Sequence, residues 1–191
     1  MLFRSAVARG NVAIEGVRGE DLRMILSVLG RLGITAELRG SALAVSGEAP
    51  LVIRSDLGDA IPSIDDGPWP AFPADLMSVA LVAATQAQGA VLFHEKMYES
   101  RLFFVDRLIG MGARVVLCDP HRALVYGPAR LRGEPAGIPS PDIRAGIALV
   151  IAALCADGRT VIRSIEQVDR GYENIEGKLL ELGARIERVT R

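Results

Sequence analysis

The stretch GAVLFHEKMYESRLFFVDRLIGMG (residues 89–112) decides the fold class of this chain. Its apolar start, opened by Gly89, predicts a β-strand, and the apolar spacing that follows is typical of an amphipathic helix. Gly112 predicts the left-handed residue that ends such a helix. Beyond it, the β-rich runs 113–117 and 123–126 flank the turn residues 119–122 and predict a hairpin. The unit is therefore a strand, a helix and a hairpin.

The same pattern occurs twice more. One copy starts with GNVAI (residues 10–14) and closes its helix with LGRLG (residues 29–33), followed by a predicted hairpin of residues 34–38 and 42–45 around the turn Gly40-Ser41. The other starts with GRTVI (residues 158–162) and closes with LELG (residues 180–183). The β-rich residues 184–189 then predict the start of a third hairpin, cut short by the C-terminus.

Two further helices precede the glycine-opened strands of the second and third copies. They are predicted over residues 75–86 and 142–156, each with proline and aspartate at its start. In the first copy, residues 4–9 resemble the last turns of such a helix, so the chain is expected to begin partway through its repeat. The sequence thus predicts one α/β domain over residues 1–191, with three βαβ-type units at about 1–55, 56–132 and 133–191. Periodicity leaves open whether helices or sheets lie inside.

Composition excludes several classes of protein. The 191 residues are 50% hydrophobic and 24% charged with a net charge of -1, which is typical of a globular domain and not of a nucleic-acid or membrane-surface binder. The longest apolar run, residues 147–156, is about half of the roughly 20 residues that a membrane span needs. The N-terminus lacks the features of a secretory signal, so a cytoplasmic location is expected.

Cys118 and Cys155 have no CxxC spacing, so neither a disulfide framework nor a zinc site is predicted. The acidic residues of the long loop are expected to be solvated rather than to bind metal; they are Asp56, Asp59, Asp65 and Asp66. His94 and His121 follow no ligand pattern and are interpreted as structural or exposed. Motifs for nucleotide hydrolysis, a Rossmann cofactor or an α/β-hydrolase are missing.

Asp75 follows the proline-rich approach PWPAFPAD (residues 68–75). Three prolines restrict the backbone there, so the carboxylate is delivered to one place at the start of an apolar helix. One interpretation is a helix N-cap. The other is a general base, which would depend on proximity more than on basicity because a helix N-terminus favours the ionised carboxylate.

Three arginines recur near equivalent points of the units: Arg101, Arg144 and Arg170. Guanidinium groups bind carboxylate and phosphate oxygens in a bidentate manner, so these arginines are candidates to hold an anionic ligand. The alternative is that each arginine forms a surface ion pair, for which Asp142 and Asp169 are candidate partners.

Four ordered motifs resemble those of the UDP-N-acetylglucosamine 1-carboxyvinyltransferase family. They are PAFPADL (residues 70–76), ESR (residues 99–101), DIRA (residues 142–145) and DRGYENIEGKL (residues 169–179). The resemblance covers essentially all of this chain, which corresponds to only about the C-terminal half of a typical family member. It implies an inside-out α/β barrel, in which two domains of three repeats enclose an active site. The shikimate-pathway enolpyruvyl transferase shares this architecture, although the FPAD and DRGY matches favour the cell-wall enzyme.

The resemblance also implies roles for residues. It makes Asp75 a general base beside the sugar 3-hydroxyl, and Arg144 and Arg170 the pair that holds phosphoenolpyruvate. The implied substrate-binding set is Asp75, Met97 (through its backbone), Arg101, Asp142, Arg144 and Arg170. The implied reaction, a step of peptidoglycan precursor synthesis, adds the hydroxyl of UDP-N-acetylglucosamine to phosphoenolpyruvate and then expels phosphate, with no metal or organic cofactor.

In that family the Lys-Asn pair and a mobile loop with a cysteine or aspartate belong to the other domain, and neither Cys118 nor Cys155 is assigned the role of the loop cysteine. The chain is therefore expected to need a complementary N-terminal domain or second chain and to be inactive without it. Two alternatives remain open at the level of sequence. One is a module that binds the nucleotide sugar or phosphoenolpyruvate without turnover, and the other is a structural or oligomerising repeat domain.

Overall fold

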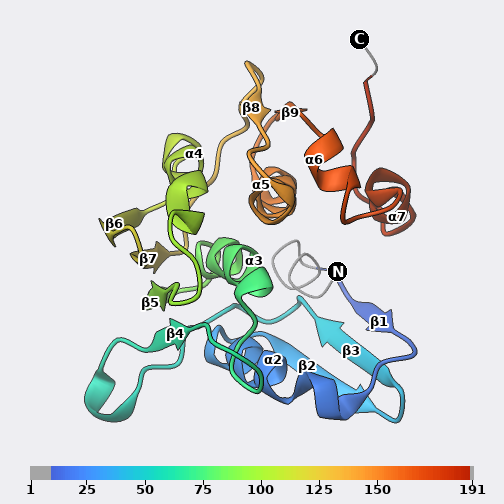
Figure 1. The fold of residues 1–191 in the computed structure, drawn as a ribbon. Helices are drawn as coiled ribbons and strands as arrows, with labels where there is room; N and C mark the ends of the chain where they lie inside the picture. Colours follow the sequence, from blue (N-terminus) through green and yellow to red (C-terminus); the bar gives the residue numbers. More distant parts are fainter. Residues whose placement is uncertain (1–9, 190–191) are drawn as a thin grey trace.

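The computed structural model describes residues 10–189, whose elements are shown in Figure 1. The predicted helix end at residues 4–9 lies outside the described residues. The elements are, in chain order, β1 (Val12–Ile14), α2 (Gly19–Arg31), β2 (Thr35–Arg39), β3 (Ala42–Ser46), the 3-10 helix η1 (Leu57–Asp59), β4 (Ser63–Asp65), α3 (Ala74–Ala84), β5 (Gly89–His94), the 3-10 helix η2 (Arg101–Phe104), α4 (Val105–Gly110), β6 (Val115–Asp119), β7 (Arg122–Gly127), β8 (Ile138–Pro139), α5 (Ile143–Cys155), β9 (Ile162–Arg163), α6 (Glu166–Asp169) and α7 (Ile175–Glu181).

Within residues 10–189 the strands form three separate sheets, with the orders β1-β3-β2, β4-β5-β7-β6 and β8-β9. The first two sheets share a plan, because the second strand of each hairpin lies between its partner and the glycine-opened strand. The pairs β4–β5 and β8–β9 are parallel, and each is connected through a buried helix, α3 or α5. These are βαβ connections, as the repeat predicts.

The predicted helix ends are confirmed in all three copies, since Gly183 also adopts a left-handed φ of 79°, and the predicted hairpin turns are confirmed in the first two. Gly33 and Gly112 adopt left-handed φ values of 75° and 101°, and the two hairpins form antiparallel pairs. The third copy differs, because residues 184–189 form no strand and the prediction of a third hairpin is wrong. A lone extended segment has no neighbouring strand to accept its hydrogen bonds. Arg188 instead ties this segment to Asp169 and Glu176 by side-chain ion pairs.

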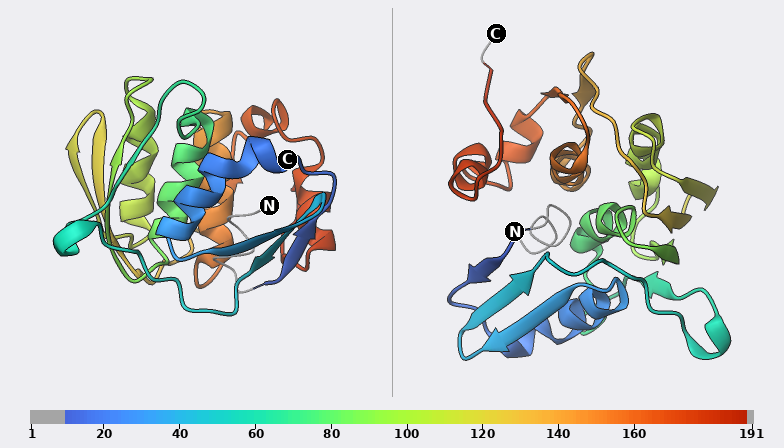
Figure 2. Two further views of the ribbon diagram at one scale, coloured as in Figure 1. Left: turned by 90° about the horizontal axis from the view of Figure 1, so that it is seen from below. Right: turned by 180° about the vertical axis from the view of Figure 1, so that it is seen from behind.

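The core settles which elements lie inside. Residues 77–84 of α3 and 145–152 of α5 are buried without interruption, and the two helices pack against each other at the centre of the molecule (Figures 1 and 2). A helix that is apolar all round has no face to turn to water. The sheets lie around these helices and leave residues such as Val116 and Tyr126 exposed. The helices α3 and α5 therefore lie inside, with the sheets around them.

The apolar run 147–156 belongs almost entirely to α5 and packs in the protein core. Within residues 10–189, no helix combines the length and the apolar character needed to cross a bilayer.

Candidate functional site

Asp75 lies in the first turn of α3 rather than at its cap. The helix begins at Ala74, Pro73 occupies the N-cap position, and no side chain caps the helix there. The N-cap interpretation of Asp75 is therefore wrong. The proline-rich approach places Pro73 at the cap, and this leaves the Asp75 carboxylate free to contact groups outside its own helix.

Those groups are two of the predicted arginines. The Arg144 Nε donates a short hydrogen bond to Asp75 Oδ1, and an Arg101 terminal nitrogen lies 3.5 Å from the same oxygen. The three residues come from α3, the first turn of α5 and the start of η2, and we call them the Asp75 cluster. Folding thus brings together two of the three arginines that the sequence places at unit junctions.

The cluster has a clear electrostatic consequence. The hydrogen bond from Arg144 holds the pKa of Asp75 below its usual range, and Arg101 acts in the same direction against the opposing effect of burial. The same hydrogen bond raises the pKa of Arg144. Arg101 also stacks on the ring of Tyr98, with its guanidinium carbon 3.7 Å from the ring centre. In this state Asp75 is an ionised carboxylate with its charge balanced by arginine.

Asp142 holds the backbone that carries Arg144. It is the N-cap of α5, and its Oδ1 accepts hydrogen bonds from the backbone N–H groups of Arg144 at 2.7 Å and Ala145 at 2.9 Å. The Asp142 carboxylate thereby anchors the turn from which the Arg144 side chain projects. The interpretation of Arg144 as a surface ion-pair partner of Asp142 is wrong, because its partner is Asp75.

Arg170 lies apart from the cluster. Its guanidinium is exposed and donates to Gln167 Oε1 at 3.4 Å, and no contact found within residues 10–189 joins it to Asp75, Arg101 or Arg144. The interpretation of Arg170 as the ion-pair partner of Asp169 is also wrong, because Asp169 pairs with Arg188 in a bidentate manner.

The turn that carries Arg170 nevertheless reaches the cluster. A Cβ on Gly171 would lie 2.7 Å from the side chain of Ile143, so this turn packs against the start of α5. Burial raises the pKa of Tyr172, with a smaller contribution from the negative charge of Asp75. The turn that carries Arg170 therefore packs beside the start of α5, whereas the Arg170 guanidinium itself contacts Gln167.

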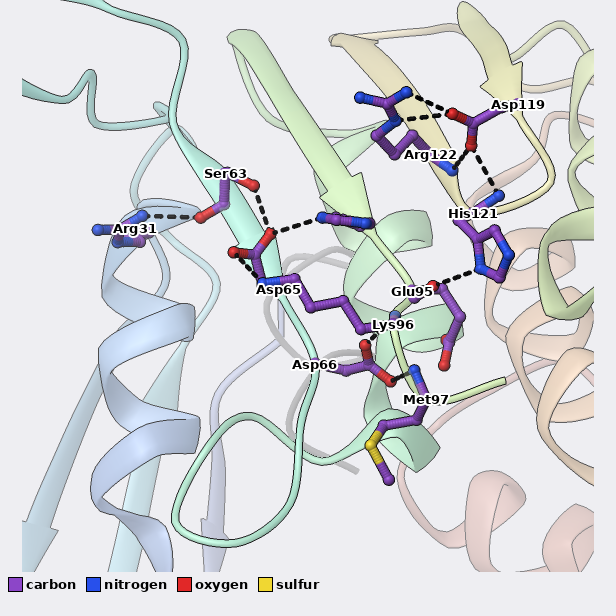
Figure 3. A network of polar contacts seen from close by, with 11 residues as sticks. Arg31, Ser63, Asp65, Asp66, Glu95, Lys96, Met97, Asp119, His121 and Arg122 are labelled. Carbon is purple, nitrogen blue, oxygen red and sulfur yellow. Dashed lines mark hydrogen bonds and ion pairs between the residues drawn. The ribbon is translucent and has the colours of Figure 1, made fainter. Parts of the chain in front are cut away.

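Met97 lies in the turn after β5, with its side chain exposed and its backbone N–H 3.3 Å from Asp66 Oδ2 (Figure 3). Asp66 is buried, so the prediction of a wholly solvated acidic loop is wrong for this residue. Asp65 remains partly exposed and pairs with the Lys96 ammonium at 3.0 Å.

Sequence reasoning missed Asp66 and Glu95 as members of this region. They follow β4 and β5, and only the parallel pairing of those strands reveals that they are neighbours. His121, interpreted as structural or exposed, contacts the Glu95 carbonyl oxygen through Nδ1 at 2.9 Å. Within residues 10–189, no three His, Cys, Asp or Glu side chains gather closely enough to hold a metal ion.

Solved structures with the same fold include the enolpyruvyl transferase NikO from Streptomyces tendae. It matches 97% of this chain and 42% of its own chain with a TM-score of 0.80 at 23% identity. EPSP synthase from Acinetobacter baumannii matches 84% of this chain and 37% of its own with a TM-score of 0.56 at 18% identity. At these identities the likeness concerns the fold alone.

Sequence comparison is more specific. A family model described as EPSP synthase (3-phosphoshikimate 1-carboxyvinyltransferase) matches residues 1–179. UDP-N-acetylglucosamine 1-carboxyvinyltransferase of Bradyrhizobium diazoefficiens is 53% identical over 97% of this chain, and the protein of that name from Treponema denticola is 51% identical over 96%. In both cases the chain spans 42% of the relative's length. The family model and the two relatives each match nearly all of this chain, and the chain therefore belongs to the enolpyruvyl transferase family.

Proposed function

We propose that this chain is one domain of an enolpyruvyl transferase that moves the enolpyruvyl group of phosphoenolpyruvate to the 3-hydroxyl of UDP-N-acetylglucosamine, in peptidoglycan precursor synthesis. The names of the relatives at 53% and 51% identity supply the nucleotide sugar and the carboxyvinyl group, and the motif resemblance supplies phosphoenolpyruvate as its donor. The convergence of Asp75, Arg101 and Arg144 carries the proposal, because it joins a carboxylate with two anion-binding groups on one surface. Asp75 is the proposed base, and Arg144 and Arg170 the proposed phosphoenolpyruvate ligands.

The ion pair explains how a weakly basic carboxylate would serve as a base. While Arg144 donates to Asp75, the pKa of Asp75 is held low. An anionic substrate that takes up the Arg144 guanidinium competes with Asp75 for it. Asp75 then loses its strongest charge partner, its pKa rises, and it accepts the proton of the sugar hydroxyl more readily. Binding of phosphoenolpyruvate and activation of the base are coupled in this scheme.

The reaction has two halves. The hydroxyl oxygen bonds to the C2 carbon of phosphoenolpyruvate while its proton passes to Asp75 and a proton is added at C3. In the second half, loss of a proton from C3 restores the double bond and the C2–O bond to phosphate breaks. Met97 through its backbone, Arg101 and Asp142 would line the nucleotide-sugar side. The acid that protonates C3 would come from the complementary domain or second chain.

The proposal includes the architecture of the complete enzyme. Residues 1–191 would form one inside-out α/β barrel domain of three units, at about 1–55, 56–132 and 133–191. The active site would lie between it and the complementary domain, and the isolated chain would be inactive. The central position of α3 and α5 inside the sheets supports this arrangement (Figure 2). The cytoplasmic location expected from the sequence stays a prediction.

Phosphate release tests the proposal directly. The chain is incubated with UDP-N-acetylglucosamine and phosphoenolpyruvate, alone and with an N-terminal half from one of the relatives named above. We expect release only in the reconstituted mixture. Calorimetric titration of the chain distinguishes the alternatives: ligand heat without reconstituted turnover favours a binding module, and heat with neither ligand favours a structural domain. Turnover with shikimate 3-phosphate in place of the nucleotide sugar would assign the chain to the shikimate pathway instead.

A further inference from the structure

Two carboxyl groups lie buried next to the turn that follows β5 (Figure 3). Glu95 is 1% exposed and Asp66 is 3% exposed. Asp65 and His94 are partners in the parallel pair β4–β5, so Asp66 and Glu95 emerge from equivalent ends of adjacent strands. Two buried carboxylates at such a position cannot both be ionised without a large cost in free energy.

The partners of the two groups differ. Asp66 accepts backbone hydrogen bonds with both oxygens, from Lys96 N–H at 2.5 Å and from Met97 N–H at 3.3 Å. Both Asp66 oxygens are thus occupied by backbone donors. The Glu95 Oε1 atom, by contrast, is buried with no hydrogen-bond partner among the described residues. Burial, followed by the contact with Asp66, raises the pKa of Glu95 to about 8. At neutral pH the proton therefore resides on Glu95.

The charged groups around the pair do not remove this preference. Arg101 lowers the pKa of Glu95, but its effect is smaller than those of burial and Asp66. The Lys96 ammonium is engaged by Asp65, which also lies 3.7 Å from His94. The His121 ring contacts the Glu95 backbone carbonyl oxygen. None of these contacts supplies a cation to the Glu95 carboxyl group that would match the cost of ionising it.

The pair sits at the base of a functional turn. The amides that Asp66 binds open the segment 96–101, which runs through the exposed Met97 and the left-handed Ser100 to Arg101. Arg101 in turn contacts both the Tyr98 ring and Asp75. A second negative charge on Glu95 would repel Asp66 and weaken its hold on the two amides, which would loosen the turn.

We propose that Glu95 and Asp66 share one proton and act as a positioning pair that holds the turn of residues 96–101, and with it the Met97 backbone and the Arg101 guanidinium, in place beside Asp75. The effect on catalysis rests on the proposed function, whereas the shared proton does not.

Carbon-13 NMR of the 191-residue chain tests the shared proton. The Glu95 side-chain carboxyl resonance, assigned by its loss in Glu95→Gln, is followed from pH 4 to pH 9.5 together with the Lys96 and Met97 backbone nitrogen shifts. We expect the carboxyl group to titrate near pH 8 and the two backbone shifts to follow it. In Glu95→Gln both backbone shifts should stay constant over that range, because the amide remains neutral. A Glu95 carboxyl that titrates between pH 4 and 5 would overturn the pair.

The positioning role is tested by kinetics in the reconstituted mixture. Above pH 8 we expect kcat/KM for UDP-N-acetylglucosamine to fall about tenfold per pH unit through a rise in KM, if only the protonated pair is competent. Glu95→Gln should lack this alkaline limb, whereas Glu95→Ala should have a high KM at every pH. Asp157→Asn is the matched control, since it removes an exposed carboxylate outside the proposed site and should keep the limb.

The outcomes separate the two proposals. An alkaline limb unchanged in Glu95→Gln would overturn the positioning role even if the carboxyl titrates near pH 8. Absence of turnover at all pH values would refute the proposed function, in which case the NMR titration still decides whether the proton is shared.

Discussion

Replacement of Asp75 by asparagine is expected to leave the fold nearly as stable as before while it removes most of the turnover. Each exposed ion pair contributes about 0.2–1 kcal/mol to stability, and the Asp75 side chain is 59% exposed. Its two pairs share one oxygen and its place in the first turn adds a few tenths of a kcal/mol. The total loss should therefore be about 1 kcal/mol, or a fall in Tm of roughly 2–4 °C for a chain of this size.

The expected kinetic effect is larger. Loss of a general base lowers kcat by about 10²–10⁴-fold, which corresponds to roughly 3–5 kcal/mol in the transition state. Urea unfolding of the chain and phosphate release by the reconstituted mixture measure the two effects separately. Asp157→Asn is the matched control, because Asp157 forms an ion pair with Arg130 at 2.6 Å, is 63% exposed and lies outside the proposed site. It should show a similar small loss of stability and normal turnover.

The pH dependence provides a further check on the same variant. Because the pKa of Asp75 is lowered on folding, its contribution to stability is present above its ordinary value of 3.8 and disappears as pH falls through the lowered pKa. The stability difference between the unmodified chain and Asp75→Asn should thus vanish in acid. If Asp75→Asn loses more than about 3 kcal/mol of unfolding free energy at pH 7, the cluster is needed mainly for stability. Unchanged turnover in this variant would refute the role of Asp75 as general base.

Three other predictions concern backbone packing at Gly127, the cap of α5 and the buried Glu95 carboxyl group. Gly127→Ala should destabilise the chain by about 1–3 kcal/mol or more in urea unfolding, because the added Cβ would lie 2.6 Å from the Ala84 carbonyl oxygen. Gly30→Ala is the control and should be neutral or slightly stabilising, because a Cβ there would meet open space. Asp142→Ala should cost about 1 kcal/mol through loss of the α5 cap, whereas Asp142→Asn should keep it, so weaker nucleotide-sugar binding by Asp142→Asn in calorimetry would isolate a role for the charge. The Glu95 pKa is raised from 4.5 to about 8, so the free energy of unfolding should fall as pH rises from about 5 to 8, where the unfolded carboxyl ionises and the folded one does not. Glu95→Gln should flatten this dependence, and an unchanged slope would show that another group causes it.

Local signals in the sequence were sufficient for most of the fold. At the predicted helix ends the backbone needs a positive φ, as at Gly33 and Gly112, and few residues other than glycine adopt it easily. Hairpin turns are likewise determined by residues that are adjacent in the chain. Helices over residues 75–86 and 142–156 were recognisable within about a residue or two of α3 and α5. The third hairpin failed because strand formation depends on a neighbour, which residues 184–189 lack within the described chain.

The sequence by itself determined the repeat, the family and the residues to consider at the site. Only the tertiary structure decided that α3 and α5 lie inside, and that Asp75 contacts Arg101 and Arg144 across 26 and 69 positions of chain. It also decided that Arg170 contacts Gln167 instead of this cluster. It also made neighbours of Asp66 and Glu95 through the parallel pairing of β4 and β5. The physical reason is that backbone preferences are set by nearby residues, whereas ion pairs and shared protons depend on distances that exist only once the core has packed.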